Sequence, residues 1–384
     1  MEWLKEWLRY GKEVKDSMST VNTMITGVGG GGVGEQILKC LKLSTIQTTI
    51  IGCDMARSSK GLREVDKAYI VPSALSENYL DCILRLCKKH DVKILFPGSE
   101  PELKVLSENR DIFFLNGICL PLNSQDVIQT CMDKNLTMNF LRQNGIATQK
   151  YWEVSDVEAL NGIDVFPVVL KPSIGGGGSV NTFIAQDRDE LEMFGKYLLG
   201  LCPIFTAQEY VGDVEHEYTV GVMSGMNGEY INSIAVKKSI LSGLSNKMRI
   251  PNRTGRIELG SVLAISSGIS QGEIGRFPEV TEPCRKIAKA LHATAPINIQ
   301  GRIHNGEFYV FEINPRISGT SSLRAMVGYN EPEMLIRERI LGENLQIDFA
   351  YEEGLITRGL EEAFISREFM NGLEDISDCR GAEC

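Results

Sequence analysis

The fold of this chain is decided by residues 298–319, which read NIQGRIHNGEFYVFEINPRISG. Asn305 and Gly306 stand between two segments of strand-forming residues, and this dipeptide is a strong signal for a β-hairpin. Side chains alternate between the two faces of a strand. We therefore expect one face of the second strand to carry Val310, Glu312 and Asn314, and the other face to carry Tyr309, Phe311 and Ile313.

Glu312 and Asn314 bring two oxygen ligands to one face of this strand. Such a strip is typical of a Mg²⁺ site, because Mg²⁺ takes a few protein oxygens together with substrate phosphates. Gln300 joins the same face only if the hairpin loop has three residues, His304 to Gly306, since a two-residue loop would turn Gln300 away from Glu312. We predict the three-residue loop. The alternative interpretation is an edge hairpin whose polar side chains are simply solvated.

Composition is that of an ordinary globular protein: 384 residues, 43% of them hydrophobic and 23% charged, which is enough for two or three domains. The net charge of −10 argues against a general nucleic-acid or anionic-membrane surface. No apolar run approaches the roughly 20 residues of a membrane span, and the N-terminus lacks a secretory signal pattern, so we expect a cytoplasmic protein. The ten cysteines form no Cys-x-x-Cys pair and are expected to be buried, reduced thiols.

The N-terminal third alternates strand and helix patterns, which is typical of a parallel sheet. It is preceded by an amphipathic helix predicted over residues 1–17. Residues 27–34, GVGGGGVG, fit the glycine fingerprint of dinucleotide-binding folds, and Asp54 follows Gly34 by 20 residues. Taken alone, this pattern predicts an NAD(P)-dependent oxidoreductase. The alternative is that the glycines only permit a tight turn from strand to helix.

Two lysines stand where a phosphate-binding site would need positive charge. Lys134 lies in the first turn of a predicted helix, where it opposes the helix dipole, so it either meets a ligand anion or is solvated. Lys171 ends an apolar strand and precedes a glycine loop, whose backbone N–H groups could contact phosphate oxygens. The alternative is a floppy hairpin tip, but consecutive glycines cost conformational entropy, which favours a functional role. The loop comprises Gly175, Gly176, Gly177, Gly178 and Ser179.

Further along, residues 205–222 read as two strands with a break near Gly212, where backbone groups could hold a flat ring. Lys237 and Lys238 are neighbours, so they point to opposite faces of one strand, and we favour Lys237 as a ligand-binding residue. Residues 240–260 predict a long mobile loop that covers a site. Its arginines, Arg249, Arg253 and Arg256, either bind an acidic substrate or are solvated, and the tail from Arg367 is expected to be loose.

Together these motifs resemble the ATP-grasp superfamily, and most closely a synthetase domain of the carbamoyl phosphate synthetase large subunit and stand-alone carboxylate–amine ligases. The resemblance covers the chain from about residue 20 to about residue 345, and it is carried by the order of the motifs. In sequence they are Lys134, Lys171 with its glycine loop, Gln208-Glu209-Tyr210-Val211, Glu217, and Gln300 followed by Glu312-Ile313-Asn314-Pro315-Arg316.

The resemblance implies a role for each matching residue. Phosphates would meet Lys134 and Lys171, with residues 175–179 closing over them as a lid. Arg316 would meet the transferred phosphoryl group and the substrate carboxylate, and Lys171 and Asn314 would assist catalysis. The remaining roles are adenine binding by Gln208, Glu209, Tyr210 and Val211, ribose binding by Glu217, a γ-phosphate contact by Lys237, and Mg²⁺ binding by Gln300, Glu312 and Asn314.

The implied fold class is α/β, of the α+β ATP-grasp type. After the helix at 1–17 we expect a Rossmann-like pre-ATP-grasp domain over 18–122. A linker helix and lid subdomain follow over 123–205, and a mixed-sheet catalytic subdomain over 206–384. The implied activity is that of an ATP-dependent, ADP-forming carboxylate–amine ligase, which activates a small carboxylate such as an amino acid as an acyl phosphate and joins it to an amine.

Expected cofactors are ATP and Mg²⁺, with two ions and with Mn²⁺ as an alternative. Expected partners are the small carboxylate and amine, with no nucleic acid and no membrane, and a homodimer is left open. Two alternative functions also stay open at this point. One is the oxidoreductase that would use the Gly27–Gly34 loop, and the other is a nucleotide-binding module without turnover.

Overall fold

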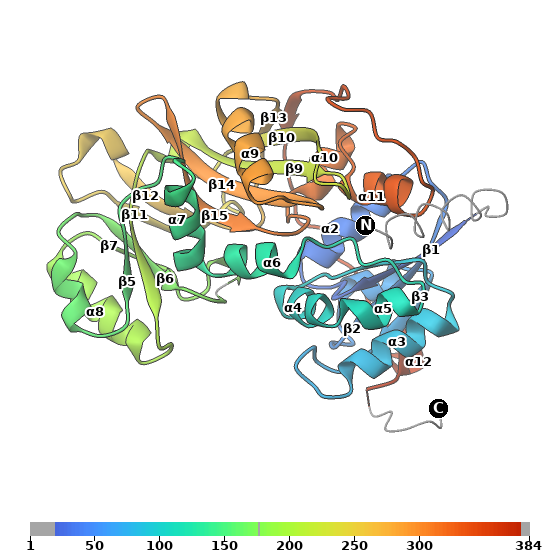
Figure 1. Cartoon of the computed structure of the whole chain (residues 1–384). Coiled ribbons are helices and arrows are strands. Elements are labelled where there is room, and N and C mark those ends of the chain that lie inside the picture. Colours follow the sequence, from blue (N-terminus) through green and yellow to red (C-terminus); the bar gives the residue numbers. More distant parts are fainter. Residues whose placement is uncertain (1–19, 176, 378–384) are drawn as a thin grey trace.

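A computed structural model describes residues 20–175 and 177–377, in which three sheet-based bodies are arranged around one cleft. Figure 1 shows the lid at the left, the N-terminal domain at the lower right and the large C-terminal sheet above them. The predicted helix over 1–17, Gly176, and the cysteines at positions 379 and 384 lie outside the described residues. Among the helices that are described, none is long and apolar enough to cross a membrane.

The N-terminal domain is the predicted succession of strands and helices around a five-stranded parallel sheet, with strand order β17-β3-β2-β1-β4. Apolar side chains from both faces of this sheet form its core. Its elements in chain order are β1 (Val21–Thr26), α2 (Val33–Lys42), β2 (Thr48–Asp54), the 3₁₀ turn η1 (Lys60–Arg63), β3 (Lys67–Ile70), α3 (Tyr79–Lys89), β4 (Ile94–Phe96), α4 (Glu100–Glu108) and α5 (Arg110–Leu115).

The end of the chain returns to this domain. A short helix, α12 (Arg367–Gly372), leads into β17 (Glu374–Asp375), which pairs in parallel with β3. The prediction of a loose tail from Arg367 is therefore wrong up to residue 377. The physical reason is that β3 leaves one edge of the parallel sheet unpaired, and backbone groups of the tail satisfy it.

The lid is a four-stranded antiparallel sheet with strand order β5-β8-β6-β7, covered by α8 (Arg188–Leu199). Two helices, α6 (Gln125–Met132) and α7 (Lys134–Gln143), lead into it from the N-terminal domain. The boundary that we predicted between residues 205 and 206 falls at the start of β8, which pairs with β5 and β6. The lid elements are β5 (Tyr151–Val154), η2 (Glu158–Gly162), β6 (Val168–Pro172), η3 (Gly177–Ser179), β7 (Phe183–Ala185) and β8 (Phe205–Glu209).

The C-terminal body is built on a six-stranded sheet with strand order β15-β14-β9-β10-β13-β16. We expected a mixed sheet, but every pair in it is antiparallel, because hairpins join its central strands. The elements are η4 (Val214–His216), β9 (Glu217–Ser224), β10 (Tyr230–Lys238), β11 (Asn246–Pro251), η5 (Ile257–Leu259), β12 (Val262–Ser266), β13 (Gly272–Gly275), α9 (Pro278–Ala290), β14 (Ile297–His304), β15 (Glu307–Asn314), α10 (Ser321–Met326), α11 (Glu331–Arg339) and β16 (Gly354–Ile356).

The two faces of this sheet have different partners. One face packs against α9, and the other contributes Met223, Ile234 and Val236 to a cluster that also holds Ile37 and Leu38 of α2. A single apolar cluster therefore joins the N-terminal domain to the C-terminal sheet, and it fixes the position of α2 against strands β9 and β10.

Residues 240–260 are more ordered than we predicted. Instead of a long mobile loop they contain β11, which pairs with β12 as a separate two-stranded sheet. Two of the three arginines are engaged as well: Arg253 pairs with Glu190, and Arg256 lies 3.1 Å from Glu209 and 2.7 Å from Glu258. The many Ser, Gly and Arg residues favoured a loop in the sequence analysis, but β11 packs against buried residues from distant parts of the chain.

The central hairpin has a different register from the predicted one. His304 pairs with Glu307, so the loop contains only Asn305 and Gly306, and the three-residue loop was wrong. Gln300 nevertheless pairs with Glu312, because a β-bulge follows it and leaves Phe311 as an extra residue on β15. The bulge also changes which side chains of β15 share a face, compared with the predicted alternation. Val310 and Ile313 lie in the core, whereas Tyr309, Phe311, Glu312 and Asn314 line the cleft.

Candidate active site

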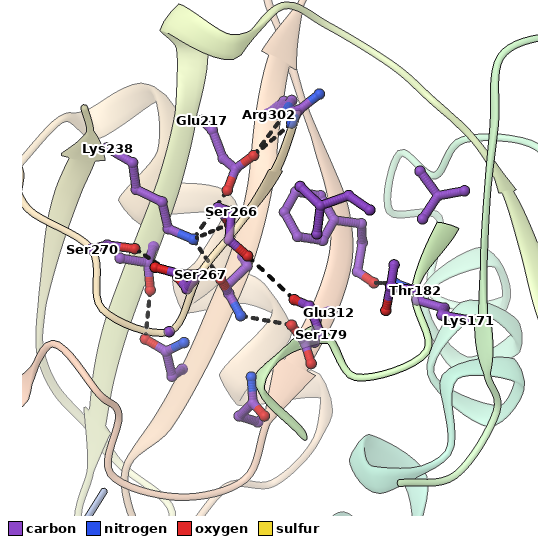
Figure 2. Close-up of a pocket in the computed structure, with 18 of the residues that line it drawn as sticks. Lys171, Ser179, Thr182, Glu217, Lys238, Ser266, Ser267, Ser270, Arg302 and Glu312 are labelled. Carbon is purple, nitrogen blue, oxygen red and sulfur yellow. Dashed lines mark hydrogen bonds and ion pairs between the residues drawn. The ribbon is translucent and has the colours of Figure 1, made fainter. Parts of the chain in front are cut away.

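A deep cleft lies between the lid sheet and the C-terminal sheet, and it collects most of the residues that the sequence singled out (Figure 2). Gly175 lines a smaller cavity that adjoins it, and Gly177 belongs to the turn η3. Lys237 does not line the cleft. The predicted residues that do so are Lys134, Lys171, Gly178, Ser179, Gln208, Glu209, Tyr210, Val211, Glu217, Gln300, Glu312, Asn314 and Arg316.

The glycine loop of the lid is tied to the start of α7. Asp133 caps this helix by accepting hydrogen bonds from the backbone N–H groups of the next turn, and it also accepts one from Ser173 Oγ at 2.6 Å. Lys134 Nζ donates to the carbonyl oxygen of Gly175 at 3.0 Å. The ammonium group is thus held beside the loop by a single weak partner, so it is available to an anion bound under the loop.

Lys171 carries a buried ammonium group that no carboxylate of the described residues contacts by a hydrogen bond. Its Nζ donates to the carbonyl oxygen of Phe311 at 3.0 Å. Burial is the main reason why the pKa of Lys171 falls to about 7, with Glu312 raising it and Lys134 lowering it by their charges. A buried ammonium group without a directly bound carboxylate is poorly compensated, and the negative charge of a bound phosphate group would compensate it.

We expect the affinity for ADP to fall as the pH rises from about 7 to about 9, by up to about tenfold per pH unit, because above the free pKa of Lys171 binding must take up a proton. Isothermal titration of the protein with ADP across this range measures the effect. In Lys171→Arg the charge is permanent, so the same titration should show a flat profile. A flat profile in the wild type would contradict the assignment of Lys171 to phosphate binding.

The candidate metal ligands lie on the two strands of the hairpin and line the cleft. Gln300 Nε2 donates to Glu312 Oε2 at 2.7 Å, and Asn314 Oδ1 accepts from Arg316 Nη2 at 3.0 Å. No cluster of three His, Cys, Asp or Glu residues occurs in the described part of the chain. The donor set is therefore one carboxylate and two amide oxygens, which suits an ion that completes its shell with phosphates and water.

Behind these ligands lies a buried ion cluster. Glu217 Oε1 is 3.0 Å from Lys238 Nζ, and Glu217 Oε2 is 2.8 Å from Arg302 Nη2 (Figure 2). Burial opposes ionisation of Glu217, but the charges of Lys238 and Arg302 outweigh it and lower the pKa of this carboxyl group to about 2. Both carboxylate oxygens are thus engaged by protein cations, and the predicted contact of Glu217 with ribose hydroxyls stays a prediction.

The choice of Lys237 over Lys238 was wrong about which lysine reaches the cleft. Strand β10 turns Lys238 inward, where its Nζ also donates to Gln300 Oε1 at 2.6 Å and Ser266 Oγ at 3.0 Å. Alternation on the strand was correctly expected, but the sequence did not say which face of β10 meets the cleft. Lys238 is the cation that connects Glu217 to the candidate metal ligands.

The hinge end of the cleft has polar groups without partners. Gln208 Nε2 and Gln149 Oε1 are buried at the cleft wall, and neither makes a hydrogen bond with the described residues. Buried polar atoms in this state are costly, so an unsatisfied donor and acceptor at a cleft wall favour a ligand with a matching polar edge. Adenine has such an edge, and these groups fit the adenine-binding role that we predicted for residues 208–211.

Sequence reasoning missed several residues that line the cleft. Glu100 enters it from the first turn of α4, and Gln149 enters from the approach to β5. Glu100 is part of the polar segment Gly98-Ser99-Glu100, which matches no binding motif, and nothing in the local sequence marks Gln149. A further group comes from the strand end and loop after β12, and comprises Ser266, Ser267, Gly268 and Ser270.

The glycine loop over residues 27–34 is explained by packing. A Cβ on Gly34 would stand 2.1 Å from the carbonyl oxygen of Gly27, so α2 can start here only with glycine. Asp54, which would hold a dinucleotide ribose, accepts hydrogen bonds from the backbone N–H groups of Gly29 and Ala56 at 2.9 Å. Both of its oxygens are used by backbone groups, one in the glycine loop and one just after β2, and the interpretation as an oxidoreductase is not supported.

Two family models match the chain. The one described as PylC-like, N-terminal domain matches residues 25–120, and the one described as ATP-grasp in the biosynthetic pathway with Ter operon matches residues 214–362. The carbamoyl phosphate synthase large chain of Methanothermobacter thermautotrophicus is 26% identical over 298 residues, covering 76% of this chain and 26% of that protein. This chain therefore spans about a quarter of the length of the curated large chains it matches.

Solved structures agree on the fold. An ADP complex of N5-carboxyaminoimidazole ribonucleotide synthetase superposes with a TM-score of 0.62 and 18% identity, covering 88% of this chain and 79% of that one. An L-amino acid ligase from Bacillus licheniformis superposes with a TM-score of 0.58 and 17% identity, covering 84% of this chain and 75% of that one. Residues 214–362 of this chain therefore form an ATP-grasp domain, which is homologous to part of the carbamoyl phosphate synthase large chain.

Proposed function

We propose that the protein is an ADP-forming carboxylate–amine ligase that activates a small carboxylate, in our proposal an amino acid, as an acyl phosphate. One observation carries this proposal. A single cleft brings together the two lysines beside the lid loop, the oxygen ligands of the hairpin and the guanidinium group of Arg316. These are the groups that a phosphoryl transfer to a carboxylate needs, since its catalysis is mainly positioning and charge stabilisation.

The side chains present fit a magnesium nucleotide. Lys134 and Lys171 would bind its phosphates under residues 175–179, and the partner-free amide groups at the hinge would meet the base. Gln300, Glu312 and Asn314 would hold Mg²⁺, two ions in our proposal, with Mn²⁺ able to replace it. When bound, the ion supplies positive charge next to the phosphates during transfer.

Arg316 is suited to orient the acid. Its Nη2 is held by Asn314 at 3.0 Å, while its Nε is buried without a partner. A planar guanidinium group can hold a carboxylate and a phosphoryl oxygen together, which keeps the carboxylate oxygen in line with the γ-phosphorus. The carboxylate oxygen attacks this phosphorus, ADP leaves, and an acyl phosphate is formed.

The second step joins the amine. Its nitrogen attacks the acyl carbon, the C–O bond to phosphate breaks, and an amide and inorganic phosphate are released. Water would destroy the acyl phosphate, so the lid loop is needed to cover it. Amino acids are our choice of substrate because the similar solved structures include an L-amino acid ligase. We further propose a cytoplasmic enzyme that acts on small molecules, and the homodimer stays open.

An ADP-release screen tests this function. Purified protein with ATP and Mg²⁺ is given single amino acids, small carboxylates and pairs of them, and released ADP and phosphate are quantified. We expect ADP above background only with an acid, and a further increase with a matching acid and amine. The absence of ADP formation with every pair, together with NADH or NADPH consumption by any of them, would contradict the proposal.

A further inference from the structure

One carboxylate in the cleft has no task in the phosphoryl transfer. Glu100 is the first residue of α4, so it comes from the N-terminal domain, and its Oε1 lies 3.3 Å from Arg316 Nη2. It lines both the main cleft and the smaller adjoining cavity. The two spaces meet at Glu100, Lys134, Phe311, Glu312, Asn314 and Arg316.

The other carboxylates that line these two spaces in the described chain are engaged. Glu217 has both oxygens on protein cations and a pKa near 2, so it cannot take up a proton at neutral pH. Glu209 pairs with Arg256 at 3.1 Å, at the hinge. Glu312 is hydrogen-bonded to Gln300 and belongs to the candidate metal ligands. Glu100 remains, and among the described residues its side chain has one charged partner, Arg316, at 3.3 Å.

The joining step needs such a group. An amine reaches the site mainly as an ammonium ion, which has no lone pair for attack, so a carboxylate must attract it and accept a proton. Glu100 stands next to Arg316, which holds the acyl phosphate in our proposed function. The apolar cluster that joins α2 to the C-terminal sheet keeps the N-terminal domain against this end of the cleft.

We propose that Glu100 binds the ammonium group of the acceptor and is the base of the joining step; this rests on the proposed ligase function. One proton passes from the ammonium nitrogen to a Glu100 carboxylate oxygen. The freed lone pair attacks the acyl carbon, and the C–O bond to phosphate breaks with its electron pair on the phosphate oxygen. The second proton leaves the new amide nitrogen with the departing phosphate, which becomes hydrogen phosphate.

The test separates the two steps by the choice of nucleophile. Protein, ATP and Mg²⁺ are incubated with pooled protein amino acids, once with hydroxylamine and once without it. Hydroxylamine is mostly uncharged at neutral pH and needs no base, so hydroxamate reports the acyl phosphate, while dipeptide measured by mass spectrometry reports the joining step. We expect Glu100→Gln to lower dipeptide formation by about 100-fold or more and hydroxamate formation by less than about threefold.

Two further variants sharpen the result. Glu108→Gln changes an exposed glutamate on the same helix outside both spaces, and it should match the wild type in both products. Glu100→Asp keeps a carboxylate on a shorter side chain, and it should recover part of the dipeptide yield. Hydroxamate formation by each variant also shows that its active site is folded.

Each contrary outcome has a distinct meaning. If Glu100→Gln makes dipeptide at the wild-type rate, or loses hydroxamate and dipeptide in equal measure, the role of Glu100 in the joining step is overturned while the ligase function stands. If the wild type makes neither product from the pool, the amino-acid ligase function fails and this inference falls with it.

Discussion

Replacing Glu312 by alanine is expected to lower acid-dependent ADP formation by roughly 100- to 1000-fold and to leave the fold intact. Glu312 is the only carboxylate of the candidate metal ligands, and its single hydrogen bond to a side chain joins it to Gln300. Without it, two neutral amides face the phosphates, so the positive charge that offsets the developing negative charge would be poorly held. Initial rates of ADP release at saturating Mg²⁺ measure the loss.

The matched control is Glu307→Ala, which removes an exposed glutamate from the same strand, β15. Its ADP release should equal that of the wild type, and the free energies of unfolding of both variants, measured by urea denaturation, should lie within about 1 kcal/mol of the wild type. Calorimetric titration adds a second measurement: Mg²⁺ should tighten ADP binding to the wild type but not to Glu312→Ala. Normal turnover in Glu312→Ala would remove this residue from the metal site.

The largest effect on stability is expected from Glu217→Ala. This change leaves the ammonium group of Lys238 and the guanidinium group of Arg302 buried without their shared counter-ion, which costs about 3–5 kcal/mol in the free energy of unfolding. Because the pKa of Glu217 is lowered in the folded state, this stabilisation is present above its unfolded value of 4.5 and is lost as the pH falls toward about 2.

Urea denaturation at neutral pH and at acid pH measures both parts of this prediction. The gap between wild type and variant should be wide at neutral pH and should narrow as the pH falls below 4.5. Glu215 is an exposed glutamate two residues earlier, and Glu215→Ala should change the free energy of unfolding by less than about 0.5 kcal/mol. A Glu217→Ala protein as stable as this control would mean that the cluster contributes nothing net to folding.

The sequence predicted the hairpin and the position of its turn correctly, but it predicted the length of the loop and the register of the strands wrongly. Asn305-Gly306 predicted the turn because this dipeptide adopts the required left-handed backbone, with φ of 51° and 80° here. The bulge at Phe311 could not be predicted, because it depends on packing of β15 against the core below it. It is this bulge that puts Gln300 opposite Glu312 and turns Phe311 into the cleft.

The sequence predicted those cleft residues that belong to a local motif, such as Lys171 before its glycine loop. It did not predict those that the fold brings together from distant segments. Lys238 reaches Glu217 and Gln300 only through the pairing of β9 with β10 and β14, and Glu100 reaches Arg316 from another domain. The glycines of residues 27–34 suggested a dinucleotide site that the structure does not support. Close packing against the backbone requires glycine just as a nucleotide site does.

The most direct measurement is a crystal structure of the protein grown with ADP, Mg²⁺ and NADH together. The account predicts ADP in the cleft, its phosphates against Lys134 and Lys171 under residues 175–179, and the metal on Glu312 and Asn314. A cleft without nucleotide and NADH bound beside residues 27–34 would contradict it.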